Sequence, residues 1–100
     1  MNEMKRMRLR VQYTAQLRTV VGRTEDEIEL PEGSNLAELL VHLASELRSE
    51  AAPFLLTPAG ELQPSLLVAV NKGAVSYREA HAVLVKAGDV VTLLPPIAGG

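Results

Sequence analysis

Residues 35–47 read Asn35-Leu36-Ala37-Glu38-Leu39-Leu40-Val41-His42-Leu43-Ala44-Ser45-Glu46-Leu47, and the rest of the chain must be arranged around this stretch. Its leucines recur at intervals of three and four residues, which places them on one side of a helix. Ser34 or Asn35 can cap the first turn, and Asn35 with Glu38 three residues later fits a capping box. The pattern predicts the main helix of the protein, ending at about residue 48.

Two strands are predicted before this helix. From Met7 to Ala15 apolar and polar residues alternate strictly, which is the pattern of a strand with one buried face. Residues 15–21 can form a short helix that stops at Gly22. Residues 26–30 then read as a second strand with Ile28 and Leu30 turned inward, and the following proline and glycine end it.

Three strands are predicted after the helix. Prolines and a glycine break regular structure over residues 51–65, where we expect a loop that tucks Phe54 under the fold. Residues 66–70 are apolar on both faces, as in a strand that is covered on each side. Residues 71–73 form a turn into a short strand at 74–76, and a turn at Gly88-Asp89 precedes the last strand, residues 90–94.

This order of elements predicts an α+β fold. One amphipathic helix that packs across a small mixed sheet of four to five strands buries both apolar surfaces. A hairpin, one helix and returning strands is also the order found in ubiquitin-like β-grasp domains. We expect one such domain over residues 1–94, with residues 1–6 frayed, followed by a flexible, extended tail over residues 95–100.

The composition excludes several classes of function. The chain has 100 residues, 47% of them hydrophobic and 3% aromatic, so one aliphatic core is expected. A net charge of −2 gives no reason to bind nucleic acid or an anionic membrane, and no stretch approaches the roughly 20 apolar residues of a membrane span. Cysteine is absent, which excludes disulfides and thiolate chemistry and fits the reducing cytoplasm.

Side chains that could bind a metal or carry out acid-base catalysis are scattered. His42 and His81 have no second imidazole at ligand spacing, so no metal is expected. Glu27 and Glu29 are turned to solvent by the strand alternation, and no acid-base pair is proposed. The basic start of the chain is interpreted as a solvated strand face or as a weak steering surface for an acidic partner. No motif of an enzyme is present, and we predict a chain that is not itself catalytic.

The C-terminal residues differ from the rest of the chain. Pro95 and Pro96 fix an extended backbone and predict a semi-rigid spacer that projects the tail from the sheet. Gly99 and Gly100 lack a Cβ, so this end of the chain can enter a narrow channel and present its carboxylate to the reactive groups of a partner. The alternative interpretation of the Gly-Gly pair is frayed chain or a cloning remnant.

Three blocks of sequence resemble the molybdopterin synthase small subunit, within the ThiS/MoaD family of ubiquitin-like sulfur carriers. The first is Val11 to Arg18 followed by Gly22, and the second is Leu67 to Asn71. The third runs from Gly88-Asp89-Val90-Val91 into residues 94–100. The double proline before the β-branched residue, the small residue and the terminal Gly-Gly resembles the molybdopterin branch more than the thiamine branch.

The resemblance implies that Gly100 is the reacting residue. In the family an ATP-dependent activating enzyme, which uses ATP and Mg, adenylates the terminal glycine, and sulfur from a donor replaces AMP to give a thiocarboxylate. The large subunit of molybdopterin synthase, in a heterotetramer with the carrier, then receives the tail and transfers its sulfur to a pyranopterin. The resemblance therefore implies no cofactor bound to the carrier and places the catalytic side chains on the partner.

The resemblance also implies a partner-binding surface. The positions that match the family's docking face are Thr14, Ala74 and Leu94, of which only Leu94 is large, and Arg18 falls in the first matching block. The tail residues Pro95, Pro96, Ile97 and Ala98 are expected to contact partners on the way to Gly99 and Gly100. The same tail is also compatible with a sulfur carrier for cysteine or thiamine biosynthesis, a ubiquitin-like protein modifier, or an interaction module that is never activated.

Overall fold

The computed structural model describes residues 5–96 of the chain. Its elements follow one another in this order: β1 (Arg6–Tyr13), α1 (Ala15–Val21), β2 (Glu25–Pro31), α2 (Leu36–Glu46), α3 (Ala52–Leu55), β3 (Leu67–Val70), β4 (Gly73–Val75), the 3₁₀-helix η1 (Tyr77–Ala82) and β5 (Val90–Leu94).

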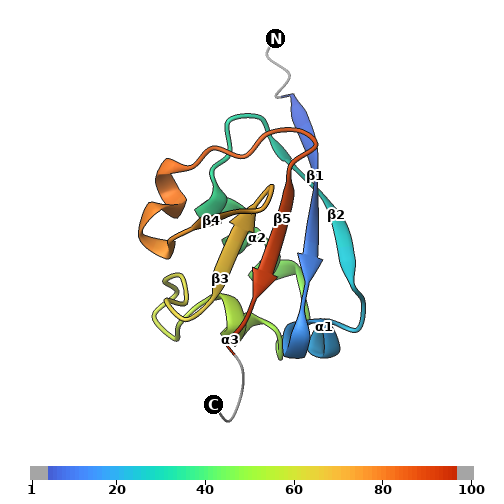
Figure 1. The fold of residues 1–100 in the computed structure, drawn as a ribbon, viewed down its shortest axis with the longest axis vertical. Coiled ribbons are helices and arrows are strands. Elements are labelled where there is room, and N and C mark those ends of the chain that lie inside the picture. Colours follow the sequence, from blue (N-terminus) through green and yellow to red (C-terminus); the bar gives the residue numbers. More distant parts are fainter. Residues whose placement is uncertain (1–4, 97–100) are drawn as a thin grey trace.

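The strands form one mixed sheet, with α2 lying across its rear face in the view of Figure 1. The strand order is β2-β1-β5-β3-β4, so β5, the last strand in the sequence, lies at the centre. β5 is parallel to β1 and antiparallel to β3, and the two outer pairs are antiparallel. The predicted β-grasp fold, a mixed sheet with one main helix packed across it, is confirmed.

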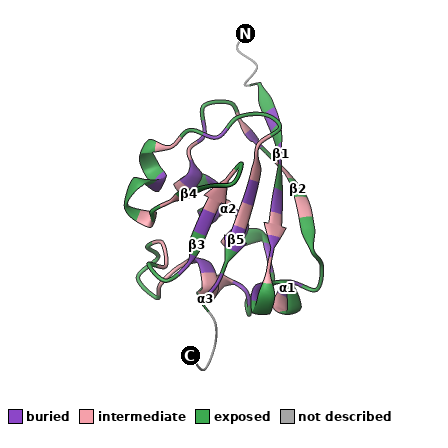
Figure 2. Ribbon diagram, viewed as in Figure 1, coloured by how far each residue is buried: buried purple, intermediate pink, exposed green. Residues whose placement is uncertain are grey.

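The core lies between this sheet and α2. Leu36, Leu39, Leu40 and Leu43 of α2 are at most 1% exposed. The inward residues of the two central parallel strands are equally buried: Leu9, Val11, Val91 and Leu93. Buried segments alternate with less buried ones along β1 and β5 in Figure 2, as the period of two in a strand requires. Because each buried leucine or valine contributes about 1.5–3 kcal/mol, this layer holds β5 firmly in place.

Asn35 is the cap of α2. Its side-chain oxygen accepts a hydrogen bond from the Glu38 backbone N–H, and the Glu38 carboxylate accepts one from the Asn35 N–H, both at 2.8 Å. The predicted capping box is therefore confirmed, and of the two candidate caps it is Asn35 that binds the helix. The hydroxyl of Ser34 instead donates to the Pro31 carbonyl oxygen. The helix ends at Glu46, two residues before the predicted end, because Leu47 adopts an extended backbone conformation.

The structure of residues 51–82 differs from the sequence interpretation in two helices. The segment expected to lack regular structure contains the short helix α3, which has Pro53 in its first turn, where a missing N–H costs nothing. Phe54, which was expected to tuck under the fold, is partly buried and packs against the core, and its neighbour Leu55 is fully buried. The 3₁₀-helix η1 was not predicted at all, although Ser76 and Glu79 form a capping box at its start.

The prediction that residues 66–70 are covered on both faces is wrong. Leu66 and Val68 are buried, but Leu67 is 65% exposed because nothing in residues 5–96 covers the outer face of the sheet. β3 therefore has one buried face, like β1.

Candidate functional site at the C-terminal end of the sheet

β5 places the start of the tail at one end of the sheet. The strand is held on both sides, by β1 and by β3, and it ends at Leu94. Pro95 is buried whereas Pro96 is exposed, so the chain leaves the body of the domain at Pro96. The predicted site residues Ile97, Ala98, Gly99 and Gly100 lie outside the described residues.

The first turn of α1 lies beside this exit. The hydroxyl of Thr14 donates to the Leu93 carbonyl oxygen at 2.9 Å and so links the β1–α1 junction to β5. Ala15 follows with a φ of 51°, in the left-handed region that residues with a Cβ rarely adopt. This turn directs α1, which carries the exposed Arg18, along the end of the sheet (Figure 1).

The outer face of the sheet carries a neutral surface next to the tail, which we call the outer patch. Residues paired directly across antiparallel strands point to the same face. Leu67 pairs with Leu94, and Ala69 pairs with Thr92 on one side and Ala74 on the other. The outer patch consists of Leu67, Ala69, Ala74, Thr92 and Leu94, in which Leu67 is 65% and Leu94 36% exposed.

The structure brings most of the predicted docking residues together. Leu94 and Ala74 lie in the outer patch, and Thr14 lies at its edge, half-buried through its bond to β5. Arg18 lies on α1, which is at the end of the sheet and outside the outer patch (Figure 1). The sequence interpretation missed Leu67, the most exposed large apolar residue of the patch. The sequence carries no signal for its exposure, because residues 66–70 are apolar throughout and show no alternation.

The other half of the same sheet face is charged. Arg6, Arg8 and Arg10 of β1 alternate with the inward residues and form ion pairs with three glutamates of β2: Glu25, Glu27 and Glu29. The shortest of these joins Arg8 Nη2 to Glu29 Oε2 at 3.1 Å. Exposed pairs of this kind stabilise a fold little, but they neutralise one another. The basic start of the chain is thus compensated by β2, which leaves the uncharged outer patch beside the tail.

A polar cluster lies at the same end, where β1 passes into α1. The Tyr13 hydroxyl donates to the Asp26 carboxylate at 2.8 Å, and Arg23 Nε donates to the other oxygen at 2.6 Å. Partial burial disfavours the charged form of Asp26, yet the bonds from Arg23 and Tyr13 outweigh it and lower the pKa of this carboxyl. Burial and the bond to Asp26 raise the pKa of Tyr13. Both groups are therefore in fixed protonation states at neutral pH, and the cluster is structural.

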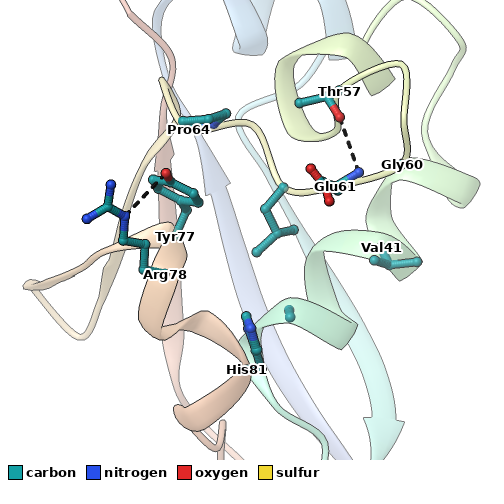
Figure 3. A pocket seen from close by; sticks show the side chains of 10 residues that line it. Val41, Thr57, Gly60, Glu61, Pro64, Tyr77, Arg78 and His81 are labelled. Carbon is teal, nitrogen blue, oxygen red and sulfur yellow. Dashed lines mark hydrogen bonds between the residues drawn. The ribbon is translucent and has the colours of Figure 1, made fainter.

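A hollow of about 650 Å³ lies elsewhere, between α2, residues 57–64 and η1 (Figure 3). Val41, Tyr77 and His81 line it. The guanidinium carbon of Arg78 lies over the Tyr77 ring, 5.7 Å from the ring centroid. None of the predicted site residues within 5–96 lines this hollow.

Residues 5–96 contain no group of three or more His, Cys, Asp or Glu side chains that could hold a metal ion. Within the same range, the helices are too short or too polar to cross a membrane.

Comparison with known proteins gives consistent matches over nearly the whole chain. The family described as "ThiS family" matches residues 11–100. The molybdopterin synthase sulfur carrier subunit of Chlamydomonas reinhardtii is 30% identical over 94 residues, which is 94% of this chain and all of that protein. The small archaeal modifier protein 3 of Haloferax volcanii is 29% identical over the same shares. The solution structure of the HVO 2177 protein of Haloferax volcanii has a TM-score of 0.82 at 27% identity, covering 99% of this chain and 92% of that one.

Proposed function

Because this chain belongs to the ThiS family of small, non-catalytic, ubiquitin-like sulfur carriers, we propose that it carries sulfur on the carboxyl group of Gly100. The observation that carries the proposal is the position of β5. β5, which ends at Leu94 just before the Pro-Pro-Ile-Ala-Gly-Gly sequence, pairs with a strand on each side at the centre of the sheet, and the outer patch lies beside its end. β5 thus gives the tail a fixed starting point, and the neutral outer patch beside it offers a surface to which a partner can bind while it positions the tail.

The chemistry follows from the low reactivity of a carboxylate. An ATP-dependent partner enzyme, supplied with Mg, joins Gly100 to AMP, which turns the carboxylate oxygen into part of a good leaving group. A sulfur donor then displaces AMP and leaves a thiocarboxylate on the chain. Because Gly99 and Gly100 have no side chains, the end of the chain can pass through a narrow channel and bring the acyl carbon into the partner's active site. Every catalytic side chain belongs to the partners, and we place the reaction in the cytoplasm.

The client we propose is the large subunit of molybdopterin synthase, with two copies of each chain in a heterotetramer and a pyranopterin as the sulfur acceptor. The support is the 30% identity to the molybdopterin synthase sulfur carrier subunit over the whole of that protein, together with Pro95-Pro96 in the tail. Leu67 and Leu94 supply the apolar contact area for this partner.

Protein modification is the second candidate function. The chain is nearly as similar, at 29% identity, to a protein whose name describes a modifier. In that case the activated Gly100 is joined to lysine amines of other proteins instead of being loaded with sulfur.

The decisive experiment is intact-mass analysis of the chain after co-expression with a cognate activating enzyme and sulfur donor. We expect one oxygen to be replaced by sulfur, and a thiol-reactive tag distinguishes this change from oxidation. The control is a chain that lacks Gly100, which should remain unmodified.

Two further results decide between the functions. If the wild-type chain is never thiocarboxylated and removal of Gly100 leaves its cellular activity intact, the carrier function is wrong. Conversion of a pyranopterin to molybdopterin by the loaded chain with a purified large subunit supports the proposed client. Lysine-linked adducts of Gly100 in cells, without that conversion, support the modifier.

A further inference from the structure

The lysines of the chain all lie at the end of the sheet opposite to the tail. There are only three, at positions 5, 72 and 86. Lys5 precedes β1, and its carbonyl oxygen accepts from the Glu32 N–H at 2.8 Å. Lys72 lies in the turn between β3 and β4, and Lys86 lies in the turn before β5. The Asn71 amide, which donates to the Asp89 carboxylate at 2.8 Å, connects these two turns.

The cations at the tail end are arginines. Arg18 lies on α1, which begins at the bond between Thr14 and Leu93. Arg23 lies in the turn after α1 and Arg48 follows α2, and all three side chains are exposed. Figure 1 shows α1 and α3 at the end where β5 stops, and the turn that contains Lys86 at the other end.

This separation matters for an activated carboxyl group. A lysine amine that loses its proton can attack the carbonyl carbon of an acyl adenylate: a C–N bond forms, the C–O bond to AMP breaks, AMP leaves with the electron pair, and the amine's proton passes to water. The product is an amide that can no longer accept sulfur. An arginine guanidinium stays protonated at any physiological pH and supplies positive charge without this reaction.

We propose that the placement of lysine and arginine keeps the activated Gly100 from reacting with its own chain; this rests on the proposed function. Val90 to Pro96 spans about 20 Å of extended chain, while the four residues after Pro96 reach at most about 14 Å. A lysine side chain adds about 6 Å to this reach. To approach the distal lysines the tail must turn back along the sheet, and the turn uses about two of its four residues. The distal lysines therefore stay out of reach. Residue 18, one helical turn of about 6 Å from Thr14, lies within reach of the tail.

The test adds an amine at the tail end. Arg18→Lys and Gln16→Lys place an amine on α1, and Arg6→Lys is the matched control at the far end. Each purified chain is incubated with the activating enzyme and Mg-ATP without a sulfur donor, and pyrophosphate release and intact mass are measured. Gln16→Lys keeps the test valid if Arg18→Lys weakens binding of the activating enzyme, because it adds an amine on α1 without changing Arg18.

We expect the two α1 variants to accumulate a product that has lost one water, at a level at least about tenfold above the wild type, since an amine held within reach reacts at a high effective concentration. Tandem mass spectrometry should locate the new amide at the introduced lysine, and Arg6→Lys should behave as wild type. If the wild-type chain releases pyrophosphate but neither α1 variant forms the amide, this inference is overturned while the carrier function stands. If the wild type releases no pyrophosphate, the carrier function fails and this inference with it.

Discussion

The polar cluster of Tyr13, Arg23 and Asp26 makes the stability of the fold depend on pH. Because the pKa of Asp26 is lowered in the folded chain, its carboxylate stabilises the fold at neutral pH. This contribution is complete above the usual Asp pKa of about 3.9 and is lost as the pH falls through the lower, folded value. Asp26→Asn should reduce the unfolding free energy at pH 7 by about 1.5–3 kcal/mol, the value of a hydrogen bond to a charged group.

Urea unfolding from pH 7 to pH 2 checks this prediction. The difference between the wild type and Asp26→Asn should shrink as the pH falls. The exposed Glu50, changed to Gln, is the matched control and should show no such difference. A difference that is constant with pH would exclude the charge of Asp26 as its cause.

A second prediction concerns the turn between β3 and β4. Asn71 and Lys72 have φ angles of 50° and 75°, as the two central residues of a type I′ turn require. Asparagine tolerates this region, but lysine does so at a cost of about 1 kcal/mol. Lys72→Gly should therefore raise the unfolding free energy by about 1 kcal/mol in urea titrations. Lys72→Ala keeps the Cβ and should leave the unfolding free energy unchanged. An equal rise in both variants would show that the lysine side chain, not the backbone conformation, destabilises the turn.

At the scale of elements, β3 and β5 together form the proposed partner surface. Leu67→Glu places a charge among the exposed leucines of the outer patch and should weaken binding of the proposed large subunit at least about tenfold, since burying an unpaired charge in an interface is costly. Val41→Glu is the matched control, because Val41 is 49% exposed but lies on α2, behind the sheet. Isothermal titration with both variants measures the effect, and equal weakening by both, or by neither, would contradict the assignment.

Periodicity in the sequence predicted the elements that form the core. The strand at β1, the short helix ending at Gly22 and the leucine face of α2 are all present, because burial of one face leaves a repeat in the sequence. The helix η1 has a single buried residue, Ala80, and no repeat, so only its capping box was available as a signal. Leu67 was misjudged because an apolar residue in a strand does not reveal whether anything covers it.

The sequence could likewise predict only part of the candidate site. The sheet register brings Ala74 and Leu94 to one face, which strand alternation alone could not establish before the strand order was known. Pro95, which the sequence interpretation assigns to the tail, is buried, whereas Pro96 is exposed. Gly99 and Gly100 lie outside the described residues, and their roles stay predictions.

At the scale of the whole molecule, the fold depends on its last strand. β5 pairs with β1 and β3, and its Val91 and Leu93 are fully buried. A chain of residues 1–89 should therefore be unfolded, because it loses the strand that joins the β1–β2 pair to the β3–β4 pair and opens the core. A chain of residues 1–96 keeps every described contact and should fold like the full chain. Circular dichroism and the dispersion of amide NMR signals distinguish these outcomes, and a folded 1–89 chain would contradict the prediction.

The central position of β5 has a consequence for how the protein is made. The ribosome completes β5, which closes the core, only shortly before it completes the tail. A product that terminates before β5 should therefore remain unfolded and open to degradation. Any copy that is folded well enough to bind the proposed activating enzyme has thus been translated at least to within a few residues of the glycine that we propose is activated. The topology should therefore keep chains that terminate before β5 from competing for the partners.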